Sequence, residues 1–142
     1  MKITRSSSAH WAGTGKDGKG SLTTASTVLN QTQYSFNARF ADGIGTNPEE
    51  LLGAAHAGCF TMAIAYALTQ KQHSPGNLNT TATVSLDMAS GSINQIKLEL
   101  SATAIEGLTL EEFEEIASEA KKNCVISKAL AGVQIELAVI YK

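Results

Sequence analysis

The chain has 142 residues, 43% of them hydrophobic, which is enough to bury one core, and we expect a single domain over residues 1–142. Its 11 basic and 13 acidic residues nearly balance, which argues against a nucleic-acid surface or a charged membrane-binding surface. Residues 1–8 contain no apolar stretch like that of a secretory signal. We therefore expect a cytoplasmic protein whose two cysteines are free thiols rather than a permanent structural disulfide.

The first forty residues predict a β-meander. Asp17-Gly18 is a strong hairpin signal, residues 20–29 are rich in Ser, Thr and Val, and residues 34–40 alternate like a half-buried strand. On this last strand Arg39 is alone on one face. The other face holds aromatic and small apolar side chains, Tyr34, Phe36, Ala38 and Phe40.

The glycine-rich segment at residues 13–18 matches the GxGxxG pattern of dinucleotide-binding proteins, and Gly20 stands where a phosphate loop needs Ser or Thr. Both patterns require a helix immediately afterwards, whereas residues 21–24 predict a strand. We therefore interpret the segment as a hairpin turn and expect no nucleotide cofactor. A metal site is not expected either, since the chain contains no CxxC or HExxH pair.

A long helix is predicted from Asn47, the N-cap, through Pro48 to about Lys71, and it ends before Pro75. Residues 51–68 carry no formal charge, but they are barely long enough to span a membrane and are rich in Ala and Gly. We interpret this stretch as a helix of a soluble protein, buried on nearly all sides. Its small residues would let a second chain approach closely.

The rest of the chain predicts strands at residues 81–88 and 93–104, a helix after the cap Thr109, a short helix at 127–131 and a strand at 133–141. The apolar positions of the capped helix share one face: Phe113, Ile116, Ala117 and Ala120. The predicted order βββαββααβ, with antiparallel meanders around a long central helix, indicates an α+β fold.

The two cysteines, Cys59 and Cys124, are either inert buried thiols or a dithiol that can be oxidised and reset. Cys59 lies in the apolar helix, where burial should raise its pKa. Cys124 lies near the start of a short helix and close to several lysines, so local physics makes it the better thiolate. Cys59 would need a specific cation. Arg39 is the best candidate, the alternative being an ordinary surface arginine.

Glu49, His56 and Cys59 project from one side of the predicted helix. Glu49 nevertheless precedes Cys59 by ten residues, about 15 Å along the axis, so it cannot touch the cysteine of its own helix. Either Glu49 serves this thiol from a second subunit, or it only occupies the first helical turn. His56, one turn before Cys59, is either an imidazolium that holds a thiolate or a hydrogen-bonded structural histidine.

Residues 45–60, GTNPEELLGAAHAGCF, closely resemble the signature of the OsmC/Ohr family, the osmotically inducible and organic hydroperoxide resistance proteins. The resemblance covers essentially the whole chain, including FNARF at 36–40, TATVSLD at 81–87 and AKKNC at 120–124. It is strongest to the OsmC branch, which carries His56 where the Ohr branch tends to have tyrosine. The family commonly has proline after the second cysteine, whereas this chain has Val125, which bears on how fast a disulfide closes.

This resemblance implies an intertwined α+β homodimer with two sites at the subunit interface, acting as a thiol-dependent peroxidase on organic hydroperoxides. Cys59 would be the peroxidatic thiolate and Cys124 the resolving thiol, with Arg39 and Glu49 activating Cys59. The family assignment of Cys59 replaces the local preference for Cys124, because Arg39 supplies the charge that Cys59 lacks. An external dithiol, of lipoyl type or a small molecule, would reset the disulfide.

Two other functions remain open at the level of the sequence. The first is a thiol–disulfide oxidoreductase without peroxidase activity, and the second is a non-enzymatic osmotic-stress or ligand-binding protein. Several apolar side chains are candidates for a substrate approach that favours alkyl hydroperoxides over hydrogen peroxide, or are plain core residues: Phe40, Leu51, Phe60, Met62 and Ile126.

Overall fold

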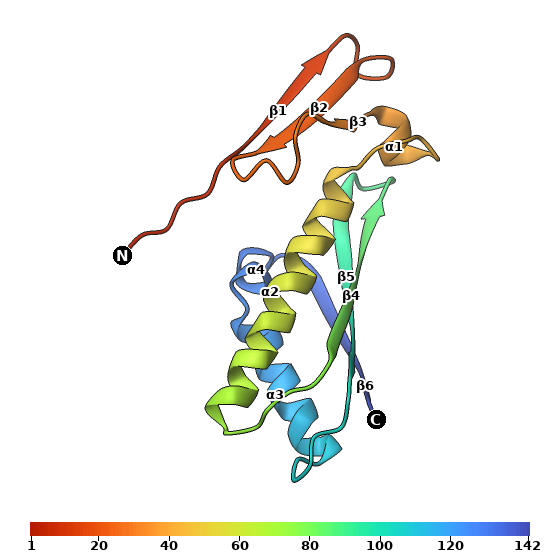
Figure 1. Ribbon diagram of the computed structural model, residues 1–142. Helices are drawn as coiled ribbons and strands as arrows, with labels where there is room; N and C mark the ends of the chain where they lie inside the picture. The colour runs from red at the N-terminus through yellow and green to blue at the C-terminus, as the bar shows by residue number, and fades with distance from the viewer. The chain divides into compact units, whose positions relative to one another are not determined.

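The computed structural model describes all residues, 1–142, and the chain divides into two compact units, Met1–Leu51 and Leu52–Lys142. The first unit contains a three-stranded antiparallel sheet in the order β1-β2-β3, followed by a short helix (Figure 1). Its elements are β1 (Ser7–Ala12), β2 (Lys19–Thr24), β3 (Thr32–Tyr34) and α1 (Phe36–Phe40).

The hairpin between β1 and β2 confirms the predicted turn. The Gly18 backbone N–H donates to the Thr14 carbonyl at 2.8 Å, and the chain continues into β2 rather than into a helix. Gly20 lies between Trp11 and Tyr34 in the register, and their ring centroids are 5.4 Å apart. A Cβ at Gly20 would meet the Tyr34 ring at 2.4 Å, so this position requires glycine for packing rather than for phosphate binding.

The strand predicted over residues 34–40 is wrong. Only β3, which ends at Tyr34, is extended, and the next residues form α1. Ser35 caps this helix by accepting a hydrogen bond from the Ala38 N–H at 3.1 Å. Phe36 and Phe40, four positions apart, pack against each other on the helix surface, with ring centroids 4.8 Å apart and ring planes tilted by 54°. Alternation alone could not separate the two structures, because this spacing fits both.

The strand predicted over residues 20–29 is shorter than expected, since β2 ends at Thr24. Thr27 and Gln31 beyond it have positive φ angles of 63° and 49°, which a continuous strand does not contain. Side-chain hydroxyls stabilise this loop instead, as the Thr24 Oγ1 accepts from the Leu29 N–H and the Thr23 Oγ1 from the Gln31 N–H.

The second unit contains the sheet β4-β5-β6 and the helices beside it (Figure 1). Its elements are α2 (Pro48–Gln70, which begins in the first unit), β4 (Leu78–Asp87), β5 (Ser92–Ala102), α3 (Leu110–Asn123), α4 (Val125–Ala129) and β6 (Gln134–Tyr141). The predicted hairpin of β4 and β5 is antiparallel, but β5 and β6 are parallel, which corrects the expectation of antiparallel meanders throughout. The two helices between them form the crossover that a parallel pair needs.

The hydrophobic core of the second unit lies between its helices and β5. Thr109 and Glu112 form a reciprocal capping box at the start of α3, as the predicted cap required. The face of α3 predicted to be buried is buried, with Phe113 fully enclosed. The core cluster is completed by side chains of α2 and β5: Phe60, Ile64, Leu68, Ile96, Leu98 and Leu100.

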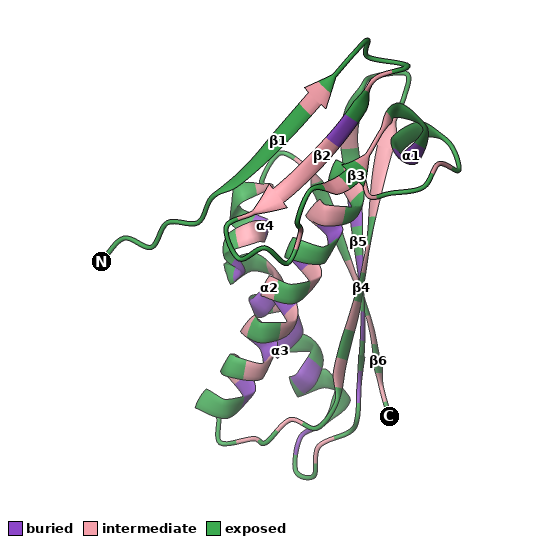
Figure 2. Ribbon diagram, turned by 45° about the horizontal axis from the view of Figure 1, so that its top comes forward, coloured by how far each residue is buried: buried purple, intermediate pink, exposed green.

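Only one face of α2 is buried within the chain, which corrects the prediction of a helix buried on nearly all sides. The buried positions recur at every third or fourth residue: Gly53, His56, Phe60, Ile64 and Leu68. A stripe on another face, Ala54, Gly58, Met62 and Tyr66, is exposed, and Figure 2 shows buried and exposed segments alternating along the helix. This helix is long and apolar enough to cross a membrane, but its buried side chains belong to the core, so we interpret it as a core helix.

Candidate active site

The two cysteines, 65 positions apart in the sequence, lie side by side in the second unit. Cys59 projects from the middle of α2, and Cys124 is the single residue between α3 and α4. Their Sγ atoms are 2.8 Å apart, and both are free thiols. Cys124 is buried and Cys59 is half-buried. Because the S–S bond of a disulfide measures about 2.04 Å, the two Sγ atoms need to move closer by less than about 1 Å to form one.

The surroundings of the two sulfurs make Cys124 the more acidic thiol. Burial, and then the hydrogen bond with Cys124, raise the pKa of Cys59, although the backbone N–H groups of Ile126 and Val125 act in the other direction. Burial alone would also raise the pKa of Cys124, but the Cys59 thiol and the backbone N–H and hydroxyl of Ser127 outweigh it and lower that pKa. This difference agrees with the local argument from the sequence.

His56 lies one turn before Cys59 and is completely buried. Its Nε2 forms a hydrogen bond of 2.8 Å with the Oγ of Ser127 in α4, while its Nδ1 has no hydrogen-bond partner. Burial lowers the pKa of His56, so the ring is neutral around pH 7. Of the two interpretations drawn from the sequence, the structure supports the hydrogen-bonded histidine rather than the imidazolium.

Because His56 is neutral in the folded chain, we expect the free energy of unfolding to fall at acidic pH. The substitution His56→Gln should reduce this loss. The unfolded chain binds a proton at a pKa near 6.5, and the folded chain only at lower pH, so the free energy of unfolding falls as pH drops below about 6.5. We expect urea unfolding at pH 7.5 and 5.5 to show a smaller loss of stability for His56→Gln than for the parent. The exposed His10 provides the control, since His10→Gln should keep the parental loss. An unchanged loss in His56→Gln would contradict the prediction.

Arg39 and Glu49 form a bidentate ion pair in the first unit, from the last turn of α1 to the first turn of α2. Arg39 Nη2 donates to Glu49 Oε1 at 2.6 Å, and Arg39 Nε donates to the same oxygen at 3.0 Å and to Oε2 at 3.2 Å. The hydrogen bond to Glu49 raises the pKa of Arg39. Burial alone would raise the pKa of Glu49, but the bonds from Arg39 overcome it and lower that pKa.

The four residues predicted for the site therefore form two pairs, the thiol pair in the second unit and the ion pair in the first. Of the apolar candidates for a substrate approach, Phe60 is a core residue, whereas Met62 and Phe40 are exposed. Sequence reasoning missed Ser127, the partner of His56. Its position three residues after Cys124, in the predicted short helix, was the signal available.

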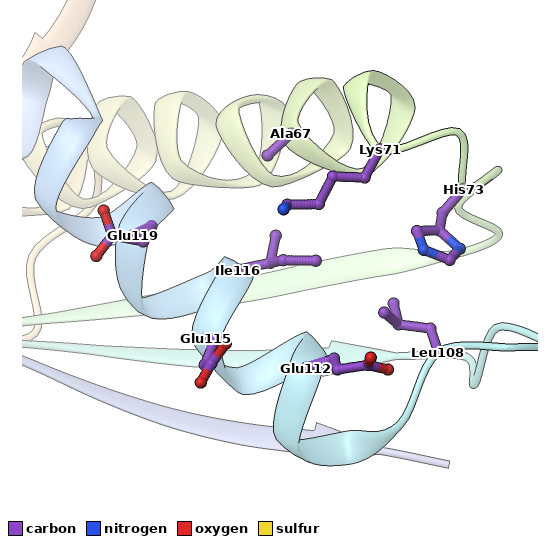
Figure 3. Close-up of a pocket in the computed structure, with 8 residues that line it drawn as sticks. All are labelled: Ala67, Lys71, His73, Leu108, Glu112, Glu115, Ile116 and Glu119. Carbon is purple, nitrogen blue, oxygen red and sulfur yellow. The ribbon is translucent and has the colours of Figure 1, made fainter.

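A separate cavity of about 460 Å³ lies between the end of α2 and α3 (Figure 3). Lys71 extends across it from just beyond α2 toward Ile116 of α3. Its lining is Ala67, Lys71, His73, Leu108, Glu112, Glu115, Ile116 and Glu119, which includes neither cysteine. The two cysteine sulfurs thus lie outside this cavity.

The chain is α+β and holds two free thiols close enough to form a disulfide, the arrangement that two-cysteine redox chemistry requires. The family model described as OsmC-like protein matches residues 41–138. The chain belongs to this family, as the signature around Cys59 had predicted.

Named relatives agree with this assignment. The chain is 44% identical to a protein named peroxiredoxin OsmC from Escherichia coli over 131 residues, which cover 92% of each chain. It is 34% identical to an organic hydroperoxide resistance protein-like protein of Staphylococcus aureus over 101 residues, 70% of this chain and 72% of that one. The crystal structure of an organic hydroperoxide resistance protein OsmC from Legionella pneumophila superposes with a TM-score of 0.72 at 27% identity, covering 97% of both chains.

Proposed function

We propose that this protein is a cysteine-based peroxidase that reduces organic hydroperoxides to alcohols, and hydrogen peroxide less efficiently, in defence against oxidative and osmotic stress. The names of its relatives support a peroxidase-type redox role. The observation that carries the proposal is the 2.8 Å separation of the Cys59 and Cys124 sulfurs, because a peroxidase that forms an internal disulfide needs its second thiol within bonding reach of the first.

In the proposed reaction the Cys59 thiolate attacks the distal oxygen of the hydroperoxide. The O–O bond breaks, the alkoxide takes up a proton and leaves as an alcohol, and Cys59 becomes a sulfenic acid. Cys124 then displaces the hydroxyl from this sulfur, which releases water and forms the Cys59–Cys124 disulfide. The disulfide protects Cys59 from irreversible oxidation.

Cys59 is the nucleophile in this scheme because Arg39 supplies the positive charge that its own helix lacks. A guanidinium beside the thiol lowers its pKa and stabilises the charge that develops on the peroxide oxygens. Glu49 orients the guanidinium through the bidentate ion pair. Without this cation, burial leaves Cys59 the weaker acid of the two thiols.

The site is proposed to form in a homodimer, with the ion pair of one subunit serving the thiol pair of the other. Glu49 and Cys59 are ten residues apart, which on a helix is about 15 Å of axial rise. The exposed stripe of α2, Ala54, Gly58, Met62 and Tyr66, offers a narrow apolar surface without charge for a second copy. We expect the protein to act in the cytoplasm, where a dithiol, lipoyl-type or small, resets the disulfide by exchange.

Stopped-flow oxidation of the reduced protein tests this function. We expect rapid thiol loss with an alkyl hydroperoxide and slower loss with hydrogen peroxide. Cys59→Ser should abolish the rapid reaction, since it removes the nucleophile. Cys124→Ser should retain it but stop at the sulfenic acid, which a sulfenic-acid-specific label detects.

Oxidation no faster than that of a free cysteine would exclude the peroxidase. If the protein then exchanged disulfides readily, the oxidoreductase alternative would replace it. If the protein showed neither reaction, and Cys59→Ser did not change its function, a non-enzymatic binding role in osmotic stress would remain.

A further inference from the structure

The buried couple of His56 and Ser127 joins the segments that hold the thiol pair. His56 Nε2 lies 2.8 Å from Ser127 Oγ, and this hydrogen bond connects α2 to α4, which lies beside it (Figure 1). His56 is completely enclosed and Ser127 is 7% exposed, so water does not compete for the bond. Removing polar groups from water has a cost that an apolar pair would avoid. A role that depends on the direction of the bond therefore explains this couple better than packing does.

Ser127 is the only buried residue of α4. The other positions of this five-residue helix are exposed or half-buried, and its first residue, Val125, is 68% exposed. The apolar side chains of this segment that reach the core, Ile126 and Leu130, are only partly buried. Apolar contacts have no preferred direction, whereas a hydrogen bond fixes the relative positions of its partners. The bond to His56 is therefore the contact that sets where α4 lies on α2.

Cys124 follows the position of α4 through its backbone. Its carbonyl accepts from the Lys128 N–H at 3.0 Å, which ties it to the turn that contains Ser127. Its side chain forms no capping bond at the start of α4, and the hydrogen bond of its sulfur is the one with Cys59. A shift of α4 along α2 would therefore move Cys124 with it and change the distance between the two sulfurs.

The His56–Ser127 bond and the thiol contact have the same spacing on both segments. His56 precedes Cys59 by three residues on α2, and Ser127 follows Cys124 by three residues, which is close to one helical turn in each case. The two contacts also have the same length, 2.8 Å. The bond thus lies about one turn from the sulfurs, where it can set their separation without being part of the reacting group.

We propose that His56 and Ser127 are positioning residues for disulfide closure, and that their bond clamps the Cys124 segment against α2. This inference rests on the proposed peroxidase reaction, because it concerns the second step. In that step the Cys124 thiolate attacks the Cys59 sulfenic sulfur, the S–S bond forms and the S–O bond breaks. The departing hydroxide takes up the proton that Cys124 lost and leaves as water. The clamp takes no part in this chemistry and acts by raising the effective concentration of one sulfur at the other.

The first test measures the equilibrium between dithiol and disulfide and needs no peroxide. Each protein is equilibrated with mixtures of reduced and oxidised dithiothreitol, and its free thiols are then alkylated and counted by mass. We expect Ser127→Ala to lower the equilibrium constant for the Cys59–Cys124 disulfide about tenfold, which raises its reduction potential by about 30 mV. Thr80→Val is the matched control. It removes a different hydrogen bond of α2, the one of 2.6 Å from Thr61 Oγ1 to Thr80 Oγ1, and should keep the parental constant.

A double variant separates positioning from stability of the fold. His56→Leu and Ser127→Ala together replace both polar partners with apolar groups, so no buried group is left unpaired. We expect urea unfolding to show this double variant to be more stable than Ser127→Ala alone, while its equilibrium constant for the disulfide stays about tenfold below the parental one. A constant that recovered together with stability would show that the couple serves only packing, and would overturn the clamp. A parental constant in Ser127→Ala would overturn it as well.

The second test resolves the two steps of the reaction. After mixing with one equivalent of alkyl hydroperoxide, we expect Ser127→Ala to form the Cys59 sulfenic acid at the parental rate and to close the disulfide about tenfold more slowly. Excess hydroperoxide should then convert more of Cys59 to sulfinic acid than in the parent, since the sulfenic acid persists for longer. Closure at the parental rate would overturn the clamp. If the parent itself does not react with the hydroperoxide, the peroxidase function fails, whereas the equilibrium test still decides the clamp.

Discussion

Replacing Arg39 with glutamine is expected to slow the oxidation of Cys59 by an alkyl hydroperoxide about 100-fold or more, because the burial of Cys59 raises its thiol pKa and no other cation has been assigned to it. Glutamine keeps the length and hydrogen-bonding capacity of the side chain but removes its charge. Stopped-flow thiol loss at several hydroperoxide concentrations measures the second-order rate constant. The rate should recover as pH rises, since a thiol without its cation still ionises at high pH.

Two further variants sharpen this test. Glu49→Gln should slow oxidation less than Arg39→Gln, because it leaves the guanidinium in place and removes only the carboxylate that orients it. Arg5→Gln serves as the matched control, since Arg5 is exposed and donates only to the adjacent Thr4 carbonyl. A parental rate in Arg39→Gln would show that the activating charge comes from elsewhere.

Oxidation to the Cys59–Cys124 disulfide is expected to raise the stability of the protein by up to about 4 kcal/mol, because the bond closes a loop of 65 residues in the unfolded chain. The sulfurs already lie side by side in the folded chain, so closure requires little rearrangement there. For a chain of this length the gain corresponds to a rise in Tm of about 10 °C. Thermal unfolding of the protein oxidised with one equivalent of alkyl hydroperoxide, compared with the dithiol-reduced protein, measures it.

Cys124→Ser provides the control for this experiment, because it cannot form the internal bond and its Tm should not depend on such treatment. Equal Tm values for the oxidised and reduced parent, with the disulfide verified by mass, would refute the expectation. That result would mean that bond formation distorts the packing of α4 against α2 by as much as the closed loop stabilises it.

Much of the fold follows from local signals. Helix α2 begins at the predicted N-cap and proline, residues 47 and 48, and α3 begins at the predicted cap Thr109. The first hairpin has its turn at the predicted Asp17-Gly18. Each of these signals acts through hydrogen bonds or dihedral angles of neighbouring residues. The prediction of a strand at the α1 segment failed because the apolar residues at positions 36 and 40 fit both the period of a strand and that of a helix. The contact that favours the helix is the cap formed by Ser35.

The site divides in the same way. The family signature identified Cys59, Cys124, Arg39 and Glu49 as candidates, and helical geometry separated Glu49 from Cys59. The Ser127–His56 couple was not predicted, because its members are 71 positions apart and nothing in either local pattern refers to the other. The parallel pairing of β5 with β6 was missed for the same reason, since it depends on how the α3–α4 crossover packs.

The family, the identity of the two thiols and the start of the helix that carries Cys59 could all be predicted from the amino-acid sequence, since these depend on residue types and on contacts within a few positions. The meeting of Cys59 with Cys124, and the burial of a neutral His56 bonded to Ser127, came from the three-dimensional packing. These properties arise from burial and from hydrogen bonds between distant segments. Both depend on which surfaces the folded chain brings together and removes from water.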